Sequence, residues 1–138
     1  MIANVAPFWV YVLPILATSI TIIKLGWPSL FQMAFIIPSA VALIGGPMSV
    51  CLHRYFAHTA FKTSRPMQFL LGVVACLANQ KGPVWWASKH RRHHRYCDEP
   101  NDPHSWTQTN FCYARIGWTI STTETNVDHE YVTKFMTF

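Results

Sequence analysis

A nearly charge-free N-terminal part constrains the fold of this sequence more than any other feature. Only one charged side chain, Lys24, precedes Arg54. Residues 8–25 form an apolar run with one charge near its end, and residues 29–52 form a second run with none. An α-helix crosses a hydrocarbon core of about 30 Å with roughly 20 apolar residues. The two runs therefore predict two membrane spans and exclude an ordinary soluble domain.

The rest of the chain predicts how these spans are oriented. A tight turn at residues 26–28 joins them, so both outer ends of the hairpin lie on one side of the membrane. Residues 54–95 carry eight basic side chains and no acidic one, which places this side in the cytoplasm. The apolar run at residues 67–79 is too short to span and predicts a re-entrant or interfacial helix. We expect an all-α integral membrane fold with residues 53–118 on the cytosolic face.

Other interpretations of these features explain less of the sequence. A secretory signal peptide at residues 8–25 would need a basic leading segment, and a second long apolar run follows at once. The basic stretch lies within apolar sequence, so we expect contact with membrane lipid or an anionic substrate, and no nucleic acid. The four cysteines form no C-x-x-C pair, and we expect them to be reduced.

Five of the seven histidines lie in two clusters directly after apolar segments. His53 and His58 form an H-x4-H pair, and the second cluster is His90, His93 and His94. On an α-helix, His93 and His94 would lie about 60° and 40° on either side of His90, so these three can converge. His53 and His58 would point about 140° apart, which suits two metal ions that each take one ligand from this pair. Imidazole suits Zn, Cu, Fe and Ni.

The remaining histidines and the arginines of the second cluster have simpler explanations. His104 and His129 are isolated, and we expect them to be ordinary surface or hydrogen-bonded residues. Arg91, Arg92 and Arg95 alone would fit a phosphate-binding belt. That alternative does not explain why histidine is used, since imidazoles at a membrane boundary are costly without a partner.

Several segments together resemble the membrane-bound fatty-acyl desaturases of the Δ9, stearoyl-CoA desaturase-like type. They are HRYFAH at residues 53–58 (the first box), HRRHH at residues 90–94 (the second box), GPVWWASKH at 82–90, DPHS at 102–105 and IGW at 116–118. The resemblance covers residues 45–118. It implies a four-span membrane fold in which residues 1–138 form part of the desaturase domain.

The resemblance also implies the chemistry of the family. Two iron ions would be held by the histidines of both boxes, and O2 would be the co-substrate for inserting a cis double bond into a long saturated acyl chain. The expected metal ligands are His53, His58, His90, His93 and His94. Electrons would come from a donor such as cytochrome b5 or a ferredoxin. In a eukaryote we expect the endoplasmic reticulum membrane, with the boxes facing the cytosol.

Five imidazoles do not complete the coordination of two irons. The family takes its remaining ligands from a later region that includes a third H-x2-H-H box, and residues 119–138 look like the loop before the third span. We therefore expect an N-terminal fragment that is inactive alone. The alternatives are another histidine-box enzyme, such as a membrane hydroxylase or monooxygenase, and a non-catalytic truncated membrane protein.

The residues before the second box leave the acyl carrier open. The acyl-CoA branch of the family has an Asn after a Gln here and an Arg-Asp pair before the first histidine of the box. Gln80 and Trp86 match this branch, but Lys81 follows Gln80, and Ser88-Lys89 replaces the Arg-Asp pair. CoA, lipid and carrier-protein linkages thus remain open. We expect Gln80, Trp86, Lys81 and Lys89 to contact the substrate, the lysines as point charges for a phosphate.

Overall fold

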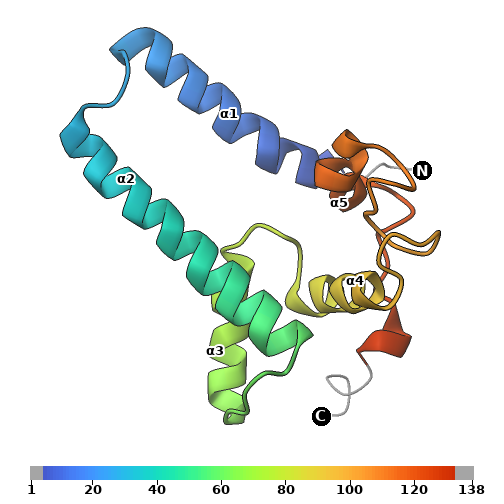
Figure 1. Ribbon diagram of the computed structural model, residues 1–138. Coiled ribbons are helices and arrows are strands. Elements are labelled where there is room, and N and C mark those ends of the chain that lie inside the picture. Colours follow the sequence, from blue (N-terminus) through green and yellow to red (C-terminus); the bar gives the residue numbers. More distant parts are fainter. Residues whose placement is uncertain (1–4, 133–138) are drawn as a thin grey trace.

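The computed structural model describes residues 5–132, with side chains from residue 12, and these residues form helices and loops without a β-strand (Figure 1). The all-α prediction is confirmed for this part of the chain, and the end of the loop predicted at residues 119–138 lies outside it. The elements are α1 (Val5–Leu25), α2 (Leu30–Leu43), η1 (Ile44–Ala57), α3 (Arg65–Cys76), α4 (Pro83–Arg95), η2 (Tyr113–Gly117), α5 (Trp118–Ile120) and η3 (His129–Tyr131).

Two long apolar arms, α1 and α2, meet at the turn of residues 26–28 (Figure 1). Gly26 has a φ of +79°, a conformation that side-chain-bearing residues rarely adopt, and it lets the chain reverse here. Ser29 then begins α2 through a capping box in which its hydroxyl accepts from the N–H of Gln32 and the Gln32 side chain accepts from the N–H of Ser29. Residues close together in the sequence therefore determine this turn.

Large apolar side chains cover the arms and face outward. Leu30 is 91% exposed and Ile23 is 82% exposed. The continuous helix Leu30–Ala57 is long and apolar enough to cross a membrane, and among the residues with described side chains it is the one helix that meets this test. The described part of α1, Val12–Leu25, is a shorter apolar helix. The two-span hairpin therefore stays a prediction.

The second arm continues from α2 into η1, a π-helix with wider turns and i→i+5 hydrogen bonds. Pro47 lies inside it, directly after Gly45 and Gly46. A proline ring inside an α-helix clashes with the carbonyl four residues earlier, and a wider turn relieves this clash. These residues therefore lie in the first turn of the π-helix, which continues past them to Ala57.

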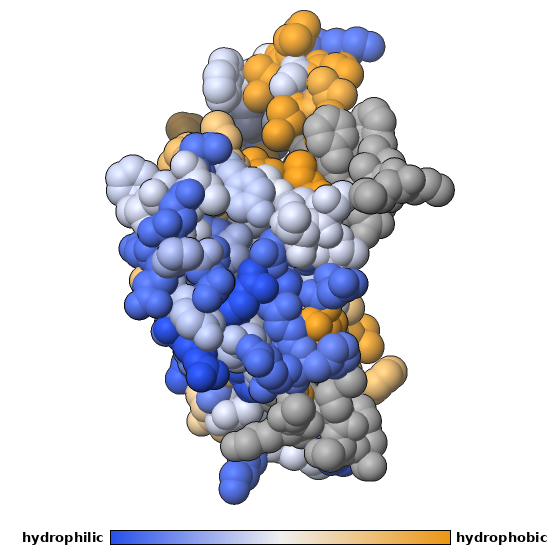
Figure 2. Space-filling model, turned by 90° about the vertical axis from the view of Figure 1, so that its right-hand side faces the viewer, coloured by the Kyte–Doolittle hydropathy of each residue, from blue (hydrophilic) through white to orange (hydrophobic). Residues whose placement is uncertain are grey.

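A small core lies where η1, α3 and α4 meet. It contains buried side chains from η1 (Cys51, Leu52, Tyr55, Phe56), from α3 (Ala75) and from α4 (Trp85, Trp86, Ala87), together with Trp118 and Val132. The helix predicted at residues 67–79 corresponds to α3, Arg65–Cys76. The face that Figure 2 turns to the viewer, on the side of α4 and α5, is largely hydrophilic. All four cysteines are free. The buried side chains of η1 and α4 in this core hold α4 against the end of the second arm.

Candidate metal centre

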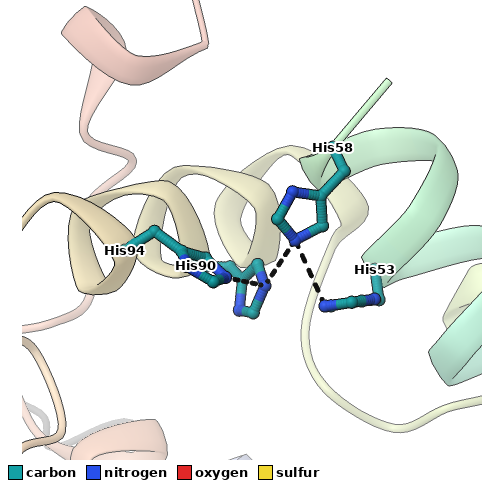
Figure 3. Close-up of side chains that lie close together, drawn as sticks. All are labelled: His53, His58, His90 and His94. Atoms are coloured by element: carbon teal, nitrogen blue, oxygen red, sulfur yellow. Dashed lines mark hydrogen bonds between the residues drawn. The ribbon is translucent and has the colours of Figure 1, made fainter. Parts of the chain in front are cut away.

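Four imidazoles converge between the end of the second arm and α4 (Figure 3). The Nε2 atom of His58 lies 3.2 Å from the Nε2 atoms of both His53 and His90. The Nε2 atom of His94 lies 3.1 Å from that of His90. One ligand atom from each of the four side chains falls within 4.8 Å of the others. The structure thus brings together four of the five predicted metal ligands.

The first box converges because η1 is not a regular α-helix. His53 lies in its last turn and His58 follows its last residue, with the His58 N–H donating to the His53 carbonyl at 3.0 Å. This i→i+5 spacing places both side chains on one side of the helix. The expected divergence of about 140° was wrong because it assumed 3.6 residues per turn. The pair can therefore face one shared site.

The second box divides its three histidines between two environments. His90 and His94 lie one turn apart on α4 and both enter the four-imidazole cluster. The His93 ring lies 6.4 Å from that of His90, against 4.6 Å between His90 and His94, measured between ring centroids. The expected convergence of all three is therefore incomplete. His93 instead turns toward the loop that follows α4.

A buried carboxylate holds His93. Its Nδ1 lies 2.9 and 2.8 Å from the two oxygens of Asp102, and the His93 and Cys97 side chains and Asp102 form a second group of possible metal ligands. Burial raises the pKa of Asp102, but the backbone N–H groups of His104 and Asp98 outweigh this and hold it below its usual range. The ionised carboxylate favours a proton on Nδ1 and leaves the Nε2 lone pair of His93 free for a ligand role.

His104 is more involved than its isolated position in the sequence predicts. Its ring is half-buried, stacks on His93 at 4.2 Å and lies 4.8 Å from the Trp118 ring. Burial, and then the electrostatic interaction with His93, lower the pKa of His104. The loop that brings Asp102 to His93 carries His104 with it, and no spacing rule predicts that contact. His129, in contrast, is an exposed residue of η3, as expected.

The charge state of the cluster suits a cation. Burial, followed by the neighbouring imidazoles His94 and His53, lowers the pKa of His90 to about 3. Burial also lowers the pKa of His58. Neutral imidazoles keep a nitrogen lone pair, which a metal ion needs.

The spacing of the nitrogens also suits a metal ion. When two imidazole nitrogens bind the same ion at about 2.1 Å, with an N–metal–N angle somewhat above 90°, they lie about 3.1 Å from each other. The observed separations of 3.1 and 3.2 Å fit this arrangement. The residues present therefore fit a metal centre.

Two basic side chains of α4, Lys89 and Arg92, form ion pairs within the protein. The Lys89 side chain is 1% exposed, and its Nζ lies 2.8 Å from a Glu124 carboxylate oxygen and 2.9 Å from one of Asp128. Arg92 pairs with the same two carboxylates at 2.6 and 2.8 Å. These contacts argue against a phosphate-binding belt. They also correct the expectation that Lys89 meets a substrate phosphate, since two carboxylates already neutralise it.

An open pocket of about 770 Å³ borders His90. Its walls are mostly apolar side chains of α2, η1, η2, α5 and the turn after α3, with Gln80, Trp86 and His104 alongside. The Trp86 ring stacks on His90 at 4.5 Å. Lys81 instead lies over the Trp85 ring, 4.1 Å from its centroid. Of the four predicted substrate contacts, Gln80 and Trp86 therefore line this pocket, whereas Lys81 and Lys89 lie elsewhere.

Comparisons with known proteins point to one family. Residues 7–137 match the family described as Fatty acid desaturase. The chain is 42% identical over 103 residues to a hex-5-enoyl-(acyl-carrier protein) acetylenase of Moorena producens, covering 67% of this chain and 29% of that protein. It is 40% identical over 76 residues to Delta-9 acyl-lipid desaturase 2 of Arabidopsis thaliana, covering 54% of this chain and 24% of that protein. It is 37% identical over 68 residues to a probable acyl-CoA desaturase of Schizosaccharomyces pombe, covering 49% of this chain and 14% of that protein. The chain thus spans less than a third of the length of these relatives. No solved structure matches it.

Proposed function

The chain belongs to the fatty acid desaturase family, and on this premise we propose that it carries the first two histidine boxes of a membrane enzyme that inserts a cis double bond into a long saturated acyl chain. The observation that carries this proposal is the convergence of His53, His58, His90 and His94 beside an apolar pocket. We further propose a Δ9 type of reaction. The relatives named above include acyl-CoA, acyl-lipid and acyl-carrier-protein enzymes, so the proposed substrate is an acyl chain linked to CoA, lipid or a carrier protein.

The proposed metal is iron, two ions in the complete site, with O2 as co-substrate. The residues that would hold it are the four clustered histidines, together with His93 through its free nitrogen. When bound, the iron would supply the oxidation that removes two hydrogen atoms from adjacent methylenes, with O2 reduced to water by these and two further electrons and protons. The electrons would come from a donor protein such as cytochrome b5 or a ferredoxin.

The residues of this chain would position the substrate. The apolar walls of the pocket bind methylene groups and exclude water, and Trp86 continues this wall up to His90. Gln80, also at the pocket, offers an amide to a polar group of the substrate. A saturated chain offers no polar atom near the reacting carbons, so its register depends on packing against such walls.

The proposed setting is a membrane with the boxes on its cytosolic face, the endoplasmic reticulum in a eukaryote. Residues 8–25 and 29–52 would be the two spans, α3 would lie at the interface and residues 53–118 would face the cytosol. The exposed apolar side chains of both arms and the length of Leu30–Ala57 support this arrangement. Labelling of single-cysteine variants at Lys62 and Asn101 from each side of sealed vesicles tests it. Labelling from opposite faces would contradict a shared site.

Metal and product analysis test the proposed function itself. The protein expressed from its natural transcript in a desaturase-deficient cell should produce cis-monounsaturated acyl chains. His90→Ala should abolish this product and lower bound iron, since it removes a ligand at the centre of the cluster. His129→Ala is the matched control, because His129 is exposed in η3. Retained iron and product in His90→Ala would refute the site, and hydroxylated chains would point to a hydroxylase.

A further inference from the structure

One side chain of the second box contacts the backbone of the first. Arg91 follows His90 on α4, about 100° further round the helix, and does not enter the imidazole cluster. Its Nε donates to the Ala57 carbonyl at 2.6 Å and its Nη2 donates to the Phe56 carbonyl at 3.0 Å. Its Nη1 donates to the Tyr131 carbonyl at 2.6 Å. Arg91 thus joins three segments that are distant in the sequence.

Two of the carbonyls that it contacts end the helix that carries the first box. Phe56 and Ala57 are the last two residues of η1, and His58 comes next. The last carbonyls of a helix lack partners within it, and they need other donors when they are buried. Both residues are buried, and Arg91 supplies donors to them. The direction in which the chain leaves η1, and with it the position of the His58 imidazole, therefore depends on Arg91.

The geometry points to Arg91 as a positioning residue that sets the distance between the two boxes at the proposed metal centre. This inference rests on that proposed centre. His58 is the member of the first box whose Nε2 contacts His90, at 3.2 Å, so any movement of the end of η1 changes this separation directly. A planar guanidinium can donate to two adjacent carbonyls at once, whereas a lysine ammonium acts as a point charge. The role therefore requires arginine and not only a positive charge.

Cobalt(II) binding to the purified, detergent-solubilised chain tests this role, with its visible absorption reporting ligand geometry. Arg91→Ala and Arg91→Lys should each weaken Co²⁺ binding 10- to 100-fold, the loss typical of residues that orient metal ligands. Both should also change the absorption bands. Arg95→Ala is the matched control on the same helix, because Arg95 is exposed and lies over the Tyr96 and Tyr131 rings. It should change the affinity less than twofold.

A double variant separates positioning from general destabilisation. If Arg91 acts through His58, then Arg91→Ala added to His58→Ala should change Co²⁺ affinity less than twofold. If Arg91→Ala still weakens Co²⁺ binding 10- to 100-fold in the His58→Ala variant, the inference is overturned. It is also overturned if Arg91→Ala or Arg91→Lys alone binds Co²⁺ as tightly as the unmodified chain. If His58→Ala weakens Co²⁺ binding and Arg91→Ala leaves it unchanged, the positioning role of Arg91 is overturned and the metal centre is not. Unchanged Co²⁺ binding by both His58→Ala and His90→Ala would overturn the metal centre as well.

Discussion

The two apolar arms and the region around α4 are built in opposite ways. Along the arms, the described side chains are mostly exposed and the hydrogen bonds are local, such as the capping box of Ser29 and Gln32. Around α4, every ion pair of the described residues involves that helix, and most join it to residues more than 30 positions away. The arms therefore present apolar side chains to their surroundings, whereas α4 is held by the rest of its own chain.

Removing the buried ammonium of α4 should have the largest effect on stability. Lys89→Ala leaves the carboxylates of Glu124 and Asp128 with Arg92 alone to neutralise them. Breaking a buried pair on one side costs about 3–5 kcal/mol, and the partial exposure of both acids favours the lower end. Denaturant unfolding in detergent measures this loss, and limited proteolysis should show cleavage near residue 124. Lys24→Ala, on the exposed first arm, is the control, and an equal loss there would contradict the contrast.

Acid should weaken the α4 region of the metal-free chain and spare the arms. The pKa of His90 is lowered to about 3, from an unfolded value near 6.5, so below pH 6.5 the unfolded chain binds more protons. Stability is therefore lost as pH falls from about 6.5 toward 3. Unfolding free energies from pH 7.5 to 4.5 measure the slope. His90→Ala should reduce it, and an unchanged slope in that variant would assign the effect to other groups.

Asp102→Asn should have a moderate effect that is specific to the second box. The neutral amide holds the proton on His93 Nδ1 less firmly, and we expect Co²⁺ affinity to fall about tenfold, or roughly 1.4 kcal/mol. Titration of the purified chain with Co²⁺ measures the change. Glu99→Gln, an exposed change in the same loop, should leave the affinity as it was. Equal affinities in the two variants would show that Asp102 does not orient a ligand.

A change on the second arm should have the smallest effect of these four in detergent. Ile37 is 53% exposed, so Ile37→Ala leaves no cavity in the protein core. The free energy of unfolding should change by less than about 0.5 kcal/mol, and Co²⁺ affinity should not change. A loss as large as that of Lys89→Ala would show that the arm packs against the chain. The contrast between the two regions would then fail.

The same contrast explains what the sequence could predict. The arms, the turn and the two histidine clusters follow from apolar runs, breakers and spacings within about 30 residues, and the structure contains helices at those places. The convergence of His53 and His58 escaped prediction because it depends on the wider turn of η1. The positions of His93 and Lys89 escaped it because Asp102, Glu124 and Asp128 reach them through loops. The periodicity of apolar residues in a sequence does not predict such contacts between a helix and a distant loop.

The ion pairs of α4 also have a consequence for the order of events during synthesis. Arg92 leaves the ribosome 32 residues before Glu124, which corresponds to roughly 2–6 s at 5–20 residues per second. During this interval the carboxylates that pair with Lys89 and Arg92 have not yet been made, so both cations would be available to the charge bias that orients membrane hairpins in the proposed setting. Once the acidic residues have been made, the same cations are neutralised within the fold. In the proposed membrane setting, these positive charges would act early on orientation, before ion pairs neutralise them in the finished fold.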